Sequence, residues 1–353
     1  MTKHATKLVG WTASLLALAA TASADIKLND NFSVGGYIAG SYEYDSKAGA
    51  AKNGADSIFD ASKGTPSANA VKTTFTASFK PVTAVISLFY QPGLASTNST
   101  NQDMTVLDAY VVTDLGDGYT VKAGKYLTPL GYEAFDPSNM AQITYGAPTV
   151  GTLAAIPGYH TGVEGDYSDK DIGAGLGLVD SVYSNNGPLR GDGELRHNAG
   201  IEGYATYKAI TDLTLWAGFA WDSKGSFETH DVYVVDVWAQ YQLTKADQVA
   251  AEFVAKDGGD SLSGPSTPSK GYDYLVFENH TWTDKVSTVF RFSGESLSGN
   301  TKKATGNPNY QQYTFSPSYK INANFLVRAE YSFYSYAGGS SKNFVGLQGL
   351  FTF

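Results

Sequence analysis

Apolar and polar side chains alternate along most of the chain, which is the period of a β-strand and not of a helix. In residues 31–44, one face carries Phe32, Val34, Ile38, Tyr42 and Tyr44, and the other face is polar. The same alternation recurs in 71–80, 82–90, 172–182, 232–243 and 343–353. The pattern therefore predicts an all-β protein.

The connections between these segments alternate in length. Long polar connections are expected near 45–68, 92–103, 127–160, 185–197, 222–229, 257–270, 297–308 and 337–341. Tight turns are expected between them, near 80–82, 115–118, 168–171, 210–212, 244–247, 283–285 and 321–324. These connections separate about 16 strands, within a range of roughly 14 to 18. Short turns alternating with long loops, together with an even strand number, predict a closed antiparallel transmembrane β-barrel with periplasmic turns and external loops.

Composition at first favours a soluble protein, because only 42% of the residues are hydrophobic. A strand that crosses lipid, however, buries only alternate residues in hydrocarbon, so a barrel needs no continuous apolar run. The net charge of −9 argues against nucleic acid as a partner. The absence of cysteine excludes disulfides and thiolate metal sites. A soluble secreted β-protein remains the alternative.

The N-terminus has the pattern of a secretory signal peptide. Lys3 and Lys7 precede a short apolar stretch, and Ala22-Ser23-Ala24 forms a small-residue cleavage site. We therefore expect residues 1–24 to be removed and 25–353 to form a single barrel domain. An uncleaved N-terminal anchor is the alternative.

Three segments carry a resemblance to known proteins. The chain ends in alternating residues 346–353 with a terminal Phe353, and residues 124–133 and 156–163 flank the longest expected loop. The C-terminal segment resembles the assembly signal of outer-membrane barrels, and the other two segments resemble the OmpL-like family of outer-membrane β-barrel porins. The resemblance implies an outer-membrane location in a Gram-negative envelope, contact with lipid, and recognition of Phe353 by the barrel assembly machinery. A homo-oligomer such as a trimer is compatible with this class.

A barrel of about 16 strands is wide enough to hold an aqueous channel. The predicted function is therefore passive diffusion of small hydrophilic solutes or ions. The connection 127–160 is long and apolar, which favours a loop that folds inward and constricts the lumen. The alternative is a lid on the rim or against a neighbouring subunit.

The alternation of inward and outward positions along each strand, together with the loop 127–160, identifies the candidate pore-lining residues. Charged side chains are expected to face inward, because a charge on the lipid face costs about 2–4 kcal/mol at the midplane. Opposed charges either orient a solute or bind one another. The candidates are Lys122, Arg291, Arg328, Glu164, Asp166, Glu202, Glu330, Tyr132, Glu133 and Asp136.

Two other functions remain as alternatives: a barrel-embedded hydrolase, and a structural or adhesive surface barrel. A hydrolase would be marked by a lipid-facing His near one rim with an acid partner. The histidines at 160, 197, 230 and 280 are instead expected singly, at loop edges or on polar faces. We therefore expect no catalytic residue, no metal site and no cofactor.

Overall fold

A computed structural model describes residues 25–46, 66–91, 104–133, 136–151, 153, 155–183, 199–223, 231–261, 264–299, 302 and 309–353. The expected signal peptide, residues 1–24, lies outside this part. The strands are β1 (Ile26–Lys27), β2 (Phe32–Asp45), β3 (Ser67–Phe79), β4 (Val82–Tyr90), β5 (Met104–Gly116), β6 (Tyr119–Leu127), β7 (Tyr159–Ser168), β8 (Ile172–Val179), β9 (Gly200–Tyr207), β10 (Leu213–Asp222), β11 (Val232–Gln242), β12 (Asp247–Ser261), β13 (Gly264–Thr281), β14 (Val286–Leu297), β15 (Tyr310–Lys320), β16 (Phe325–Tyr336) and β17 (Ser341–Thr352).

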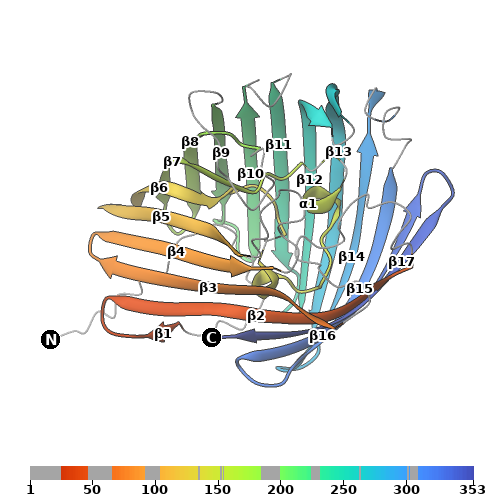
Figure 1. Cartoon of the computed structure of the whole chain (residues 1–353), viewed down its shortest axis with the longest axis horizontal. Coiled ribbons are helices and arrows are strands. Elements are labelled where there is room, and N and C mark those ends of the chain that lie inside the picture. Colours follow the sequence, from red (N-terminus) through yellow and green to blue (C-terminus); the bar gives the residue numbers. More distant parts are fainter. Residues whose placement is uncertain are drawn as a thin grey trace.

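The strands form a closed barrel (Figure 1). Each strand from β2 onward pairs antiparallel with the next, and β17 pairs with β2, so that 16 of the 17 strands make a ring. The short β1 pairs with β2 as an extra strand outside the ring. Closure satisfies the backbone hydrogen bonds of every strand, which an open sheet in lipid cannot do. The predicted fold is confirmed.

The tight turns lie where they are expected, and one long connection does not. The β5–β6 turn has Gly116, Asp117 and Gly118 at positive φ, a conformation that favours glycine. Residues 257–270, expected as a long loop, are instead largely extended, because β12 continues to Ser261 and β13 begins at Gly264. That expectation is wrong.

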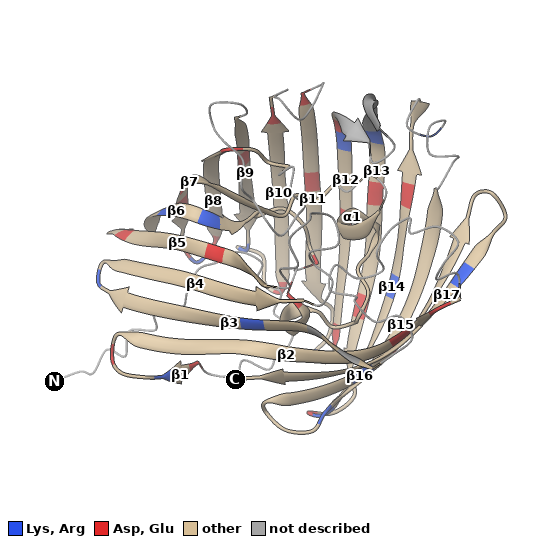
Figure 2. Cartoon of the chain, in the orientation of Figure 1, with Lys and Arg blue, Asp and Glu red and all other residues tan. Residues whose placement is uncertain are grey.

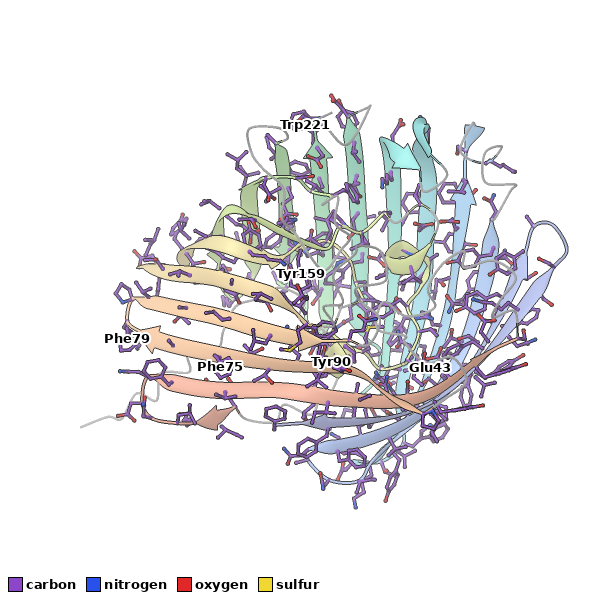
Figure 3. All side chains as sticks on the ribbon, viewed as in Figure 1. Glu43, Phe75, Phe79, Tyr90, Tyr159 and Trp221 are labelled. Atoms are coloured by element: carbon purple, nitrogen blue, oxygen red, sulfur yellow. The ribbon has the colours of Figure 1, made fainter. Side chains whose placement is uncertain are left out.

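Alternation places one apolar stripe of each strand on the outer surface. Phe75 and Phe79 of β3 are 45% and 53% exposed and point away from the lumen (Figure 3). Aromatic side chains lie near the ends of the outward stripes, as in the interfacial girdles of membrane barrels. They include Tyr44, Phe79, Tyr119, Tyr207, Tyr241, Trp282 and Tyr319. Among the described residues, no helix is long and apolar enough to cross a membrane.

Candidate channel and the loop folded into it

The connection between β6 and β7 enters the barrel. It contains the short helices η1 (Pro137–Asn139) and α1 (Ala147–Val150), and α1 contacts β13 and β14 from inside (Figure 1). Its two ends meet where the Thr128 backbone N–H donates to the Gly158 carbonyl at 3.0 Å. We call residues 128–158 the inner loop.

The first turn of the inner loop is held by carboxylates on the opposite wall. The Gly131 N–H donates to Asp236 Oδ2 of β11 at 2.7 Å, and the Tyr132 N–H donates to Glu252 Oε1 of β12 at 2.7 Å. Both carboxyl groups are buried, and each accepts one backbone N–H of the loop. The loop therefore crosses the lumen at this point.

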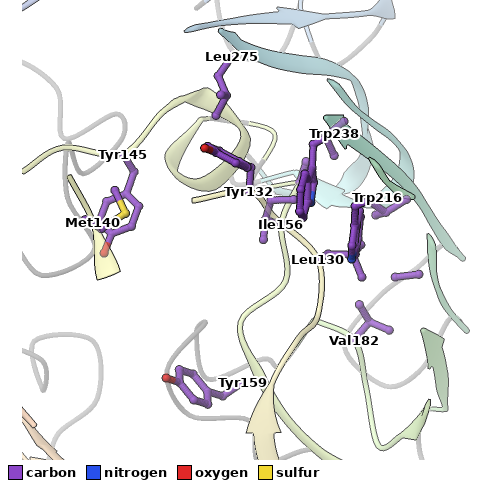
Figure 4. Packing of buried hydrophobic residues seen from close by; sticks show 14 of the residues in the cluster. Leu130, Tyr132, Met140, Tyr145, Ile156, Tyr159, Val182, Trp216, Trp238 and Leu275 are labelled. Atoms are coloured by element: carbon purple, nitrogen blue, oxygen red, sulfur yellow. The ribbon is translucent and has the colours of Figure 1, made fainter. Parts of the chain in front are cut away.

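Apolar side chains fix the same turn. Tyr132 packs edge-on against Trp238 at 5.5 Å and Phe277 at 5.8 Å between ring centroids. Leu130 and Ile156 belong to the same buried cluster (Figure 4). Burial raises the pKa of Tyr132, so its phenol stays protonated and donates to Gln240 Oε1 at 3.2 Å. The apolar residues that suggest an inward loop are thus buried against the lumen wall.

The centre of the inner loop is held by an ionic cluster on β14, β15 and β16. Arg291 Nη1 lies 2.5 Å from Glu133 Oε1 and donates to the Thr144 carbonyl at 2.6 Å. Glu330 accepts from the Ile143 N–H at 2.5 Å, the Thr144 N–H at 3.0 Å and the Thr144 hydroxyl. Three predicted residues from distant parts of the chain, Glu133, Arg291 and Glu330, therefore converge on one buried network.

Further ties surround this network. Lys72 of β3 lies 2.8 Å from Asp136 Oδ2 and 3.1 Å from Asp108 Oδ2. Arg328 of β16 donates to the carbonyls of Met140 and Pro137. The loop is thus bound both to β3 and to β16, which lie on either side of β2 and β17.

The last part of the inner loop is held by β12 and β14. The Leu153 N–H donates to Glu295 Oε2 at 2.6 Å, and Lys256 Nζ donates to the Leu153 carbonyl at 3.2 Å. Figure 2 shows acidic and basic positions on strands around the barrel wall.

The remaining predicted residues lie on β6, β7 and β9. Lys122 Nζ is 2.7 Å from Glu164 Oε1, and Asp166 accepts from the Tyr204 hydroxyl at 2.9 Å. Glu202 accepts from the Thr128 hydroxyl at 2.9 Å at the root of the loop. All seven predicted strand residues are on inward positions, but they form several separate groups and not two opposed rows.

Residues that the candidate set omitted hold much of the loop. Asp236 and Glu295 each accept a loop N–H, and Lys72 and Lys256 each bind the loop. The alternation of 232–243 already places Asp236 on the polar stripe. Its role could not be inferred, because its partner is 105 positions away in the sequence.

Two histidines lie within the described residues. His160 is fully buried on β7, with Nε2 2.7 Å from Glu202 Oε1. His280 lies on the outward face of β13 with Nδ1 2.5 Å from Asp247 Oδ1. Both are paired with acids. His160 lies at the loop edge and on the polar face of β7, as expected, whereas His280 lies on the outward face, which was not expected. His197 and His230 lie outside the described residues.

Polar side chains line the lumen at the short-turn ends of β3 to β9. Inward polar groups there keep partial exposure, including Thr76, Thr83, Thr120, Asp166 and Thr206. Inward positions of β8 include glycines at 173, 175 and 177, and the neighbouring side chains of Thr206, Tyr204 and Tyr126 lie over them. Hydroxyl groups and one carboxylate suit a hydrated solute.

Comparison with known proteins agrees with this architecture. The sequence profile of the family described as beta-barrel porin-2, OmpL-like, matches residues 31–351. Sequence comparison with the curated proteins finds no match.

Solved structures of similar fold include outer-membrane channels. The channel DcaP of Acinetobacter baumannii is 13% identical, with a TM-score of 0.62 over 93% of this chain and 99% of that one. OprB of Pseudomonas putida is 12% identical, with a TM-score of 0.62 over 92% of this chain and 94% of that one. An anion-selective porin from Comamonas acidovorans is 13% identical, with a TM-score of 0.61 over 91% and 99%. At these identities the likeness shows the fold alone.

Proposed function

The chain belongs to the beta-barrel porin-2, OmpL-like family, and from this premise we propose that its inner loop narrows a lumen that carries small hydrophilic solutes or ions. A member of this family is a passive outer-membrane channel in contact with lipid. The observation that carries the proposal is the inner loop's attachment to β3, β11, β12, β14 and β16. These ties support a constriction over a lid on the rim.

An engineered disulfide tests the position of the loop. A Cβ atom at Gly146 would lie 3.4 Å from the Cβ of Ser293 on β14, close to the spacing of a natural disulfide. The chain contains no cysteine, so Gly146→Cys with Ser293→Cys introduces a unique pair. We expect rapid cross-linking on mild oxidation of the folded barrel. The pair Gly338→Cys with Ser293→Cys is the control, because Gly338 faces open space. If the first pair links no faster than the control, the loop does not sit in the lumen.

Bilayer recordings test the constriction itself. Removal of residues 137–150 should raise the single-channel conductance and the size limit for sugars in a liposome-swelling assay. Unchanged values with an intact barrel would assign the narrowing to another part of the lumen. A protein with no step conductance in several salts would instead support a structural surface barrel.

The remaining expectations become parts of this proposal. Residues 1–24 are a signal peptide cleaved after Ala24, Phe353 is recognised by the assembly machinery, and the barrel forms a homo-oligomer such as a trimer. N-terminal sequencing, a Phe353 deletion and light scattering in detergent test these in turn.

We also propose that the barrel is not an enzyme. The outward pair His280 and Asp247 meets one requirement of a lipid-facing hydrolase site. Within the described part of the chain, however, no hydroxyl is hydrogen-bonded to His280, and Thr288, opposite it on β14, accepts from Trp282 Nε1 at 3.0 Å. Release of fatty acid from phospholipid vesicles by the purified barrel would overturn this.

A further inference from the structure

Three potential metal ligands meet on the outer surface of the barrel. Asp247 begins β12, and His280 lies directly opposite it on β13. Glu278 lies two positions before His280 and therefore on the same face of the strand. One ligand atom from each of the three residues lies within 4.8 Å of the others. We call this cluster the rim site, since it borders the short turns Leu243–Ala246 and Trp282–Lys285.

Neighbouring side chains hold two of these ligands in place. The Thr244 hydroxyl donates to Asp247 Oδ2, while Oδ1 faces His280. The indole of Trp282 packs against the His280 ring with centroids 4.1 Å apart, and its Nε1 is itself held by Thr288. Groups that orient ligands from behind raise the affinity of metal sites.

The rim site contains more acidic than basic side chains. In the part of the chain that the structure describes, no Lys or Arg nitrogen lies within 4.0 Å of the carboxylate of Asp247 or Glu278, and Glu278 has no hydrogen-bond partner there. Two carboxylates beside one imidazole give an excess of acidic groups at the edge of a lipid-facing surface. A divalent cation would balance their negative charge.

The donor set decides which cation fits. One imidazole nitrogen and two carboxylate oxygens match the mixed ligands of Zn²⁺ and its neighbours among the transition metals, whereas Ca²⁺ takes six to eight oxygens. Bonds of about 2.0 Å in a tetrahedral complex place the ligand atoms about 3.3 Å apart. Asp247 Oδ1 and His280 Nδ1, at 2.5 Å, would move apart slightly to admit the ion. The side chains of both are 26% exposed, which leaves a path from solvent.

We propose that the rim site of Asp247, Glu278 and His280 binds one divalent transition-metal ion of the Zn²⁺ class at the periplasmic edge of the barrel. The ion joins β12 to β13 across the start of one strand and the end of the other. The site faces away from the lumen, so the proposal stands apart from the channel function.

Equilibrium binding to the refolded full barrel, free of any histidine tag, tests the proposal. Zn²⁺ binding is measured against a chromophoric chelator, and Co²⁺ replaces it as a spectroscopic probe. We expect one ion per chain and the visible absorption bands of a four-coordinate Co²⁺ complex. Excess Ca²⁺ or Mg²⁺ should not displace the ion.

Two variants and a control separate binding from folding. His280→Ala should weaken Zn²⁺ binding at least tenfold. Glu278→Gln should also weaken it at least tenfold and leaves the pair Asp247–His280 intact, so it stays informative if His280→Ala does not fold. Asp284→Asn removes the same charge from the adjacent exposed turn and should not change the affinity. Equal Zn²⁺ affinity in Glu278→Gln and the wild type, or no bound ion at millimolar Zn²⁺, would overturn the proposal.

Discussion

The ion pair between Glu133 and Arg291 offers the sharpest test of how the inner loop is held. Both side chains are almost fully buried, at 2% and 0% exposure, and Glu133 also accepts from Gln142 Nε2 at 2.5 Å and from the Gly146 N–H. Glu133→Gln keeps the shape and removes the charge. Arg291 is then left buried without its carboxylate.

Breaking a buried pair in this way costs about 3–5 kcal/mol. Arg291 keeps its bonds to Thr144 and Thr314, so we expect the lower end, about 3 kcal/mol. The strand ladders of β14 do not involve Glu133, so the cost falls on attachment of the loop and not on closure of the barrel. A change of about 3 kcal/mol increases the detached fraction of the loop roughly a hundredfold, at about 1.4 kcal/mol per factor of ten.

Planar-bilayer recordings measure this effect as open-channel noise and conductance, both of which should rise in Glu133→Gln. The control is Glu278→Gln, the same chemical change on the outer face, where conductance should stay at the wild-type value. Adding Arg291→Met to Glu133→Gln removes the unpaired charge and should restore part of the attachment. If Glu133→Gln conducts like the wild type, with equal noise, the ion pair does not hold the loop.

Three further outcomes are expected. Tyr132→Ala should leave a cavity beside Trp238, which weakens the packing of the loop by about 3–5 kcal/mol and raises the conductance. An unchanged size limit for sugars would contradict this. Leu347→Arg, on the outward face of β17, should lower the free energy of unfolding measured in urea by about 2–4 kcal/mol. Equal stability would mean that this face does not contact lipid. The backbone N–H groups of Ile172 and Asp171 donate to the Asp169 carboxylate in the β7–β8 turn and lower its pKa. The ionised carboxylate therefore stabilises the turn at any pH above the ordinary pKa of aspartate, and this stabilisation is lost as the pH falls through the lowered pKa. A carboxyl ¹³C titration that gives Asp169 an ordinary pKa would refute this.

Alternation predicted the barrel because it is a local property of the chain. In β2, each residue's side follows from its neighbours, and Phe32 and Ile38 face outward as the pattern requires. Turns are similarly local, as in the Gly116–Gly118 turn. The same reasoning was wrong for residues 257–270. Their Gly, Ser and Pro content is typical of loops, but pairing between β12 and β13 keeps them extended.

The arrangement of the lumen could be predicted only in part. Parity alone places Arg291 and Arg328 inward. Their partners are far along the chain, with Glu133 158 positions and Met140 188 positions away, so no sequence pattern links them. Val234 and Leu275 are apolar although they face inward, because the apolar side of the inner loop covers them.

The basic residues of the lumen are mainly anchors for the loop, which changes what a substitution of them measures. Lys72, Lys256, Arg291 and Arg328 each bind the inner loop, through Asp136, Leu153, Glu133 and backbone carbonyls respectively. A cation already bonded at short distance to an anion or carbonyl presents little free field to a passing solute. Replacing one of them therefore alters the size and steadiness of the opening first, and ion preference only as a consequence. A shift in reversal potential should accordingly occur only together with a change in conductance. A shift at unchanged conductance would show that these charges act directly on the permeating ion.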